Sequence, residues 1–223
     1  MSREADVRAL RGAERAKRQE LGCLAVALAL TAATACSSHM THDPAAPAEY
    51  KVRLETTKGD VLLLVHRDWA PVGADHFYKL VQIGFYDGNR FFRALRGFVV
   101  QWGMNGDPTV NKRWSDVTLE DDPSKVSNKT GTITFAKSSE PNSRSTQLFV
   151  NLGDNSRLDS QGFAPFGEVI QGMDNLASVY MDYGEGPPGG SGPDQAAIAA
   201  QGNAYLNQNF SKLDYIKTAR IVQ

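Results

Sequence analysis

The sequence predicts a mainly antiparallel β domain with two helices, because strand-like patterns recur through most of residues 50–223. Apolar and polar residues alternate from Val52 to Thr56, and an apolar run returns at 61–65 after a Lys-Gly-Asp turn, as in a β-hairpin. Further strand-like runs lie at 98–102 and beyond residue 130. A segment of this length can bury one sizeable core, so we expect a single domain.

Two stretches show helical rather than strand spacing. Pro71 opens the first, whose apolar residues fall on one face, and Gly84 closes it. The second helix is expected around 173–181. After a long connection, a last strand is expected near 215–221.

The most informative stretch reads FFRALRGFVVQWG, residues 91–103, and sets Arg93 among aromatic and branched apolar side chains. Burying a charge is costly unless it is paired and hydrogen-bonded, and arginine stays charged with five donors at any working pH. Arg93 is therefore either a functional donor beside an apolar pocket or a member of a structural ion pair. The nearby Arg96 lies in an expected turn and is predicted to be solvated.

Two later stretches favour the functional alternative. The first, TGTITFAKSSEPNSRSTQLFV at 130–150, contains two strand-like runs around a polar loop, and Gln147 and Phe149 project to the same face. The second, RLDSQGFAPFGEV at 157–169, adds further apolar residues and another short strand.

Together these three stretches resemble the cyclophilin family of peptidyl-prolyl isomerases. The family pattern runs F-H-R-x-I-x-G-F-x-x-Q-x-G, then M-A-x-x-x-x-N-x-x-x-S-Q-F-F, then L-D-x-x-x-x-x-F-G-x-V. The resemblance covers about residues 50–172 and, weakly, the last strand. It implies a closed eight-stranded antiparallel barrel capped by two helices, with peptidyl-prolyl cis-trans isomerase activity.

The resemblance also implies a role for each matching position. Arg93 falls on the catalytic arginine, and Gln101, which we also assign to catalysis, falls with Gln147 on groups that hydrogen-bond the substrate backbone. For any one apolar member of the site, ordinary core packing is the alternative. Ala136 and Lys137 fall on the strip along which the peptide lies. The apolar pocket that receives the proline is expected from Phe98, Val99, Phe149 and Leu158, with Phe163 at its edge.

Three positions depart from the family pattern. Phe92 replaces the usual histidine before the arginine, and Leu148 replaces the first of two phenylalanines. Arg157 stands where many eukaryotic members carry the tryptophan important for cyclosporin binding, so weak cyclosporin binding is expected. None of these changes removes the arginine or the pocket, and catalysis is expected to survive them.

Isomerisation of an X–Pro bond can be explained without a cofactor. Amide resonance imposes a barrier of ~18–20 kcal/mol, and rotation breaks this conjugation and pyramidalises the proline nitrogen. A donor aimed at that nitrogen, or at the carbonyl that swings during rotation, stabilises the twisted state. Because no proton moves, no acid, base, metal or nucleophile is required.

We therefore expect no cofactor and no metal. His39 and His42 lie near only one cysteine, Cys36, and His76 is expected in a helix. The acidic run at 120–122 is predicted to be a solvated loop rather than a metal site.

Residues 1–36 have the layout of a secretory signal. A basic stretch is followed by an apolar run at 21–35 that is too short to span a bilayer comfortably, and small residues lead to Cys36. The pattern resembles a bacterial lipoprotein signal, in which Cys36 would carry a lipid anchor, although Ala33 stands where such signals usually have leucine. Cleavage after Ala33-Thr34-Ala35 without lipidation is the alternative.

The remaining composition suits an exported protein. Residues 37–49 are mostly Ser, Pro, Ala, Thr and His, which predicts a flexible tether before the domain at 50–223. That domain contains no cysteine, so we expect a periplasmic or cell-envelope protein, anchored to the membrane by lipid.

Without residues 1–36, 18 basic and 21 acidic side chains remain, a formal charge of −3 that argues against nucleic acid as the main partner. We expect a monomer that binds proline-containing polypeptides.

One segment, residues 183–210, falls outside the family pattern. It begins with YGEGPPGGSGPD and continues with QAAIAAQGNAYL, which predicts a Gly/Pro-rich loop and a helical turn or two. The segment is either a long surface connection or a docking element for a partner or substrate.

Two functions stay open: an exported isomerase that speeds folding of envelope proteins, or a proline-binding chaperone or docking module with little catalysis.

Overall fold

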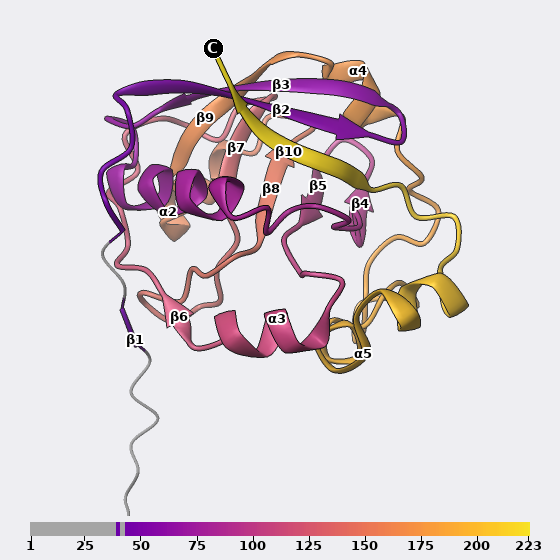
Figure 1. Cartoon of the computed structure of the whole chain (residues 1–223). Coiled ribbons are helices and arrows are strands. Elements are labelled where there is room, and N and C mark those ends of the chain that lie inside the picture. Colours follow the sequence, from indigo (N-terminus) through magenta and orange to yellow (C-terminus); the bar gives the residue numbers. More distant parts are fainter. Residues whose placement is uncertain (1–38, 41–42) are drawn as a thin grey trace, which may run out of the picture. The chain divides into compact units, whose positions relative to one another are not determined.

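One curved eight-stranded antiparallel sheet organises the domain (Figure 1). The structure is a computed structural model that describes residues 39–40 and 43–223. The strands follow the order β10-β2-β3-β9-β7-β8-β5-β4 across the sheet. Their bounds are β2 (Glu49–Thr56), β3 (Gly59–His66), β4 (Arg93–Leu95), β5 (Val99–Trp102), β7 (Thr132–Phe135), β8 (Leu148–Asn151), β9 (Pro165–Gln171) and β10 (Ile216–Val222).

The two edges of this sheet meet without a regular ladder. The chain just before β4 bonds to the start of β10: Gly88 N–H donates to the Ile216 carbonyl (2.8 Å) and Phe91 N–H to the Asp214 carbonyl (3.0 Å). In return, Ile216 N–H donates to the Asn89 carbonyl at 2.9 Å. The prediction of eight antiparallel strands is confirmed. The sheet curls into a half-barrel, and these irregular backbone bonds join its two edge strands.

Helices at the two ends of the barrel connect the described strands. The predicted helices are α2, which begins at Pro71 and is followed by Gly84 with a φ of +71°, and the short α4. The helical turn or two predicted within 183–210 is the longer α5, and α3 was not predicted. Among the described residues no helix is long and apolar enough to cross a membrane. The bounds are α2 (Pro71–Gln82), α3 (Pro108–Trp114), α4 (Met173–Ala177), α5 (Gln195–Asn209) and the 3-10 helix η1 (Ser156–Gln161).

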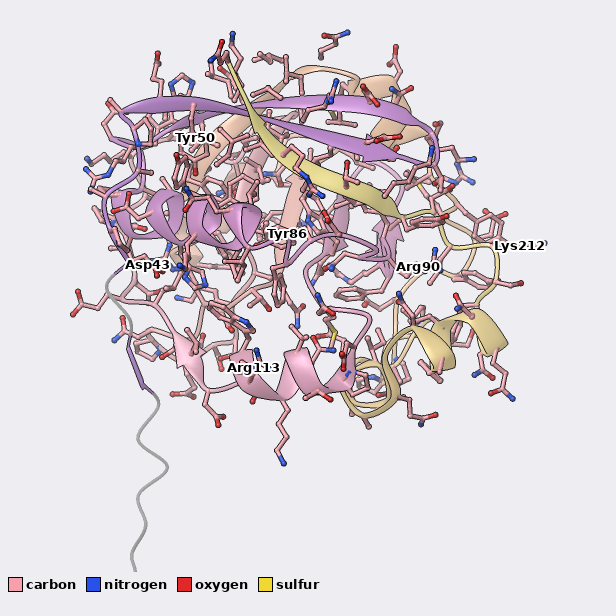
Figure 2. All side chains as sticks on the ribbon, viewed as in Figure 1. Asp43, Tyr50, Tyr86, Arg90, Arg113 and Lys212 are labelled. Carbon is pink, nitrogen blue, oxygen red and sulfur yellow. The ribbon has the colours of Figure 1, made fainter. Side chains whose placement is uncertain are left out.

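The chain that precedes β2 contacts α2. Asp43 lies beside this helix (Figure 2), with its carboxylate 2.6 Å from Nδ1 of the buried His76. The Ala46 N–H donates to Asp75 at 2.8 Å. A separate two-stranded parallel pair joins β1 (His39–Met40) to β6 (Val117–Thr118). Part of the predicted tether therefore lies against the domain, whereas the predicted signal and Cys36 lie outside the described residues.

The core fills the space between the sheet and α2. The Phe166 ring packs with its centroid 5.2 Å from both Phe77 of α2 and Phe135 of β7. Tyr50 projects from β2 toward α2 (Figure 2), and its hydroxyl donates to the Ala74 carbonyl at 2.6 Å. Burial raises the pKa of Tyr50, so this hydroxyl stays protonated and remains a donor.

The acidic run at 120–122 is the predicted loop with Glu120 and Asp121 exposed, but the prediction of a solvated side chain is wrong for Asp122. The Asp122 side chain is only 2% exposed and accepts the N–H groups of Val72 (3.0 Å) and Gly73 (2.9 Å) at the start of α2. It also pairs at 2.9 Å with Arg144, whose side chain is 1% exposed. Ala70, at the N-cap of α2, has no capping side chain, so Asp122 supplies an acceptor from a distant part of the chain.

Replacing Asp122 should therefore destabilise the domain strongly. Asp122→Ala leaves the buried Arg144 without its closest carboxylate and two helix N–H groups without an acceptor, which we expect to cost about 3–5 kcal/mol. Urea unfolding measures the loss. Lys129→Gln breaks an exposed pair with Asp154 and should cost less than about 1 kcal/mol. A loss in the Asp122 variant as small as in this control would contradict the capping role.

Candidate functional site

Pairing of neighbouring strands brings the predicted catalytic residues into one line across the sheet. In the strand register, Arg93 of β4 lies opposite Gln101 of β5, and Gln101 lies opposite Phe149 of β8. Residues directly opposite each other share a face of the sheet, and so do residues two apart on one strand. Val99 therefore joins this face, and four side chains from three strands converge there.

An apolar pocket forms beside this line. Val99, Phe149 and Leu158 form a buried cluster, and Phe98, Ala136 and Phe163 pack against it. The Phe149 and Phe163 rings meet edge to face with their centroids 5.8 Å apart. We call these six residues the apolar pocket. Its members come from β5, β8, η1 and the chain next to β7 and β9.

A row of polar side chains borders the apolar pocket. Arg93 donates from Nη1 to Oε1 of Gln101 (3.0 Å), and Gln101 donates from Nε2 to Oε1 of Gln147 (2.8 Å). Because a guanidinium only donates, it determines the orientation of both amides: Gln101 must turn its oxygen to Arg93 and its NH₂ group to Gln147. Gln147 in turn donates to Oε1 of Gln195 at 3.0 Å. We call Arg93, Gln101 and Gln147 the polar row.

Gly103 places the end of the polar row. It follows β5 with a φ of +110°, and a Cβ atom there would collide with the carbonyl oxygen of Thr146 and the Cα of Gln147. The Thr146 hydroxyl donates to the Gly103 carbonyl at 2.8 Å. Glycine thus lets the chain entering β8 lie against the end of β5, which sets Gln147 beside Gln101.

Glu185 forms a two-pronged ion pair with Arg93. Nε of Arg93 donates to Oε1 (2.8 Å) and Oε2 (2.9 Å) of Glu185, and Nη2 donates to Oε2 (2.7 Å). Hydrogen bonding from Arg93 lowers the pKa of Glu185, so the carboxylate is ionised at neutral pH. The sequence left Arg93 as either a functional donor or an ion-pair partner, and the structure shows that it has an ion pair.

An open groove with a volume of about 910 Å³ runs past Gln101 and Gln147 of the polar row, whereas Arg93 lines a smaller neighbouring pocket with Glu185. Gln101, Ala136 and Gln147 line it from the barrel, and α3 and α5 line it from the other side. Lys137 also lines the groove, but its ammonium lies 3.3 Å from a carboxylate oxygen of Asp121 and does not join the apolar pocket.

The structure thus brings together nearly all of the residues predicted for the site. Arg93, Gln101 and Gln147 form a chain of hydrogen bonds, and the six predicted apolar residues share one pocket. Lys137 lies outside that pocket but lines the groove with Ala136, and its ammonium pairs with Asp121. Their functional roles stay predictions. The prediction missed Glu185 and Gln195, because one acidic residue in a Gly/Pro-rich loop carries no local signal of its distant partner.

Arginine side chains also face the outer wall of the apolar pocket. The Cζ atom of Arg157 lies 4.7 Å from the centroid of the Phe98 ring, and that of Arg93 lies 5.5 Å away. Such cation–π contacts stabilise the ring without adding an acceptor. Arg96, by contrast, pairs with Asp182, and both side chains are mostly exposed. The predicted solvation of Arg96 is therefore confirmed.

Comparison with known proteins identifies the family. The family model for "cyclophilin type peptidyl-prolyl cis-trans isomerase/CLD" matches residues 51–187, more than half of the chain. The chain therefore belongs to the cyclophilin-type peptidyl-prolyl cis-trans isomerase family. The matched region contains the polar row, the apolar pocket and Glu185, and it ends before α5.

Individual relatives agree with this assignment. The chain is 34% identical over 134 residues to peptidyl-prolyl cis-trans isomerase A of Dickeya dadantii, covering 58% of this chain and 70% of the relative. It is 28% identical over 136 residues to peptidyl-prolyl cis-trans isomerase B of Escherichia coli, covering 57% and 82%. A Cryptosporidium parvum cyclophilin-type isomerase, crystallised in the presence of the dipeptide Ala-Pro, shares the fold with a TM-score of 0.54 at 22% identity, covering 78% of this chain and 99% of that one.

The edge of the apolar pocket offers a test of binding. Phe163→Ala removes an aromatic ring that is only partly buried, so the fold should persist while prolyl contact is lost. A loss of about 1–2 kcal/mol of apolar contact would raise the Kd for an Ala-Pro peptide roughly 5- to 30-fold in an NMR titration. Ile170→Ala, at an exposed position of β9, is the control and should leave the Kd unchanged. Equal Kd values for the two variants would mean that proline binds elsewhere.

Proposed function

We propose that this protein accelerates cis-trans isomerisation of X–Pro bonds in polypeptides, with Arg93 as the donor to the twisted amide. One observation carries the proposal. Three of the five N–H groups of Arg93 bond to Glu185 and Gln101, and within the described part of the chain the other two, one on each terminal nitrogen, make no hydrogen bond. These two donors belong to a guanidinium that lies beside the apolar pocket.

The geometry suits a reaction that needs only rotation. A prolyl ring seated between Val99, Phe149 and Leu158 would be held still while the acyl side of the bond turns. An unused N–H of Arg93 would then meet the proline nitrogen as it loses conjugation and gains a lone pair. This donor favours the twisted state over both planar states, and its charge is little screened, because the side chain is only 21% exposed.

The amides of the polar row supply contacts for the substrate backbone. Gln101 donates one N–H of its side-chain NH₂ group to Gln147, and Gln147 donates one to Gln195, so each retains a second N–H for a peptide carbonyl. Both residues line the groove, which is open enough to admit an extended chain. The substrate class is therefore proline-containing polypeptides, in agreement with the Ala-Pro dipeptide named for the Cryptosporidium relative.

Loss of the Arg93 guanidinium should abolish most of the activity. Arg93→Ala removes the only proposed donor to the twisted amide, and we expect kcat/KM in a proline-peptide isomerisation assay to fall about 100-fold or more. Arg96→Ala is the matched control, since it removes an exposed arginine three positions away and should leave the rate unchanged. Circular dichroism checks that both variants fold. A well-folded wild-type protein without activity would overturn the proposal.

A proline-binding module with little catalysis is the second candidate. The observation that favours it is the ion pair with Glu185, which occupies two of the five N–H groups that Arg93 could offer a substrate. The two candidates differ in the Arg93→Ala variant. A binding module would lose little affinity for prolyl peptides and would show no acceleration in the wild-type protein.

We further propose that the protein is exported and anchored in the cell envelope as a monomer, where it would assist folding of envelope proteins. The signal-like residues 1–36, the position of Cys36 and the cysteine-free domain support this location. Cys36→Ser should release the protein from the membrane fraction into the soluble periplasmic fraction, as measured by immunoblotting of fractionated cells. Cleavage without lipidation predicts instead that wild type and variant are equally soluble.

A further inference from the structure

The extra segment, residues 183–210, is attached firmly to the barrel. Phe92, Ile198, Leu206 and Leu213 form a buried cluster of their own, against which Tyr183 and Phe210 also pack. The rings of these two aromatic residues meet edge to face, 4.9 Å apart, and so join the two ends of the segment. Phe92, which replaces the histidine of the family pattern, thus provides the apolar surface that receives α5.

Backbone bonds attach the second half of the segment to the barrel as well. Gly202, at a break in α5 with a φ of +57°, lies where a Cβ atom would collide with the Gly106 carbonyl. The adjacent Asn203 N–H donates to that carbonyl at 2.9 Å. α5 also lies beside α3 (Figure 1). Asp194 caps α5 by accepting the Ala197 N–H at 2.9 Å.

The loop that carries Glu185 is ordered by its own hydrogen bonds. Gly192 N–H donates back to the Glu185 carbonyl at 2.9 Å, and Gly189 N–H donates to the Gly186 carbonyl at 3.0 Å. The Gly186 N–H also donates to Oε1 of Glu185 at 3.1 Å, which fixes the carboxylate itself. Glu185 therefore presents its carboxylate from a loop that is hydrogen-bonded to itself and to the carboxylate.

The extra segment consequently contacts both ends of the polar row. Glu185 accepts from Arg93 at one end, and Gln195, the first residue of α5, accepts from Gln147 at the other. An arginine side chain has four rotatable bonds and loses about 2 kcal/mol of rotamer entropy when it is fixed. A carboxylate that binds two guanidinium nitrogens at once fixes the plane of the guanidinium before substrate arrives.

We propose that Glu185 is a positioning residue, which holds the guanidinium of Arg93 in the orientation that directs its two unused N–H groups to the prolyl amide. The proposal rests on the isomerase activity proposed above. It assigns the extra segment a task in catalysis, which is to supply the fixed carboxylate that completes the active site. Glu185 itself does not touch the substrate.

Two substitutions at Glu185 and one control test this role in the full-length protein. Glu185→Gln keeps one acceptor oxygen but loses the charge, and Glu185→Ala loses both, so we expect kcat to fall in the order wild type, Gln, Ala. The Ala variant should lose about tenfold or more in kcat, with KM within about twofold of wild type, because a misdirected donor weakens the transition state and not the proline pocket. The control is Asp182→Asn, three positions before Glu185. It breaks only the exposed pair with Arg96 and should leave kcat unchanged.

An NMR readout separates positioning from general loss of structure. The Nε–H signal of Arg93, assigned by its absence in Arg93→Lys, should be sharp and slow to exchange in wild type and broadened in Glu185→Ala, with the backbone amide spectrum of the barrel preserved. A kcat in Glu185→Ala equal to wild type would overturn the inference. A higher kcat/KM would overturn it too, and would show that the carboxylate competes with substrate. A wild-type protein that fails to accelerate isomerisation would instead overturn the proposed function, and this inference with it.

Discussion

A guanidinium can donate hydrogen bonds but cannot accept them, and this constraint orders the whole site. Arg93 requires an oxygen from each neighbour, so Gln101 turns its amide oxygen inward and Glu185 presents a carboxylate. The orientation of Gln101 then determines that of Gln147, and that of Gln147 determines its contact with Gln195. One residue type at one position thus fixes the direction of the side-chain hydrogen bonds from Arg93 through Gln101 and Gln147 to Gln195.

Two apolar clusters, one beside Arg93 and one around Phe92, hold this part of the chain in the position that the hydrogen bonds of Arg93 require. The strand register sets Arg93 opposite Gln101 and next to the pocket of Val99, Phe149 and Leu158. The preceding residue, Phe92, belongs to the other cluster, with Ile198 and Leu206 of α5. Consecutive residues of an extended chain point to opposite faces, so Arg93 joins the polar row while Phe92, just before β4, anchors the extra segment. The polar row and the cluster that anchors the extra segment are therefore linked by one peptide bond.

Local patterns predicted most of the fold and most of the site. The hairpin of β2 and β3, the Pro71 start of α2 and the residues around Arg93 could be recognised because each signal lies within a few positions. α3 could also have been predicted, since Asp107 caps it by accepting the Thr109 N–H and Pro108 follows at the first helical position.

Contacts between distant parts of the chain could not be predicted in this way. Asp122 resembles a solvated acid in the sequence, yet it accepts from residues 49 and 50 positions away at the start of α2. Arg93 and Glu185 are 92 positions apart, and neither sequence neighbourhood indicates the other. The resemblance read from the sequence covered about residues 50–172 and ended before the segment that supplies Glu185, so it gave no partner for Arg93.

A structure of the protein with a bound Ala-Pro-containing peptide tests most directly whether the extra segment positions Arg93 for the proposed reaction. We predict a prolyl ring in the pocket of Val99, Phe149 and Leu158 and an N–H of Arg93 on the prolyl amide, with the Glu185 carboxylate still bonded to Nε and Nη2. A peptide that displaces Glu185 from Arg93, or that binds outside this pocket, would contradict that arrangement.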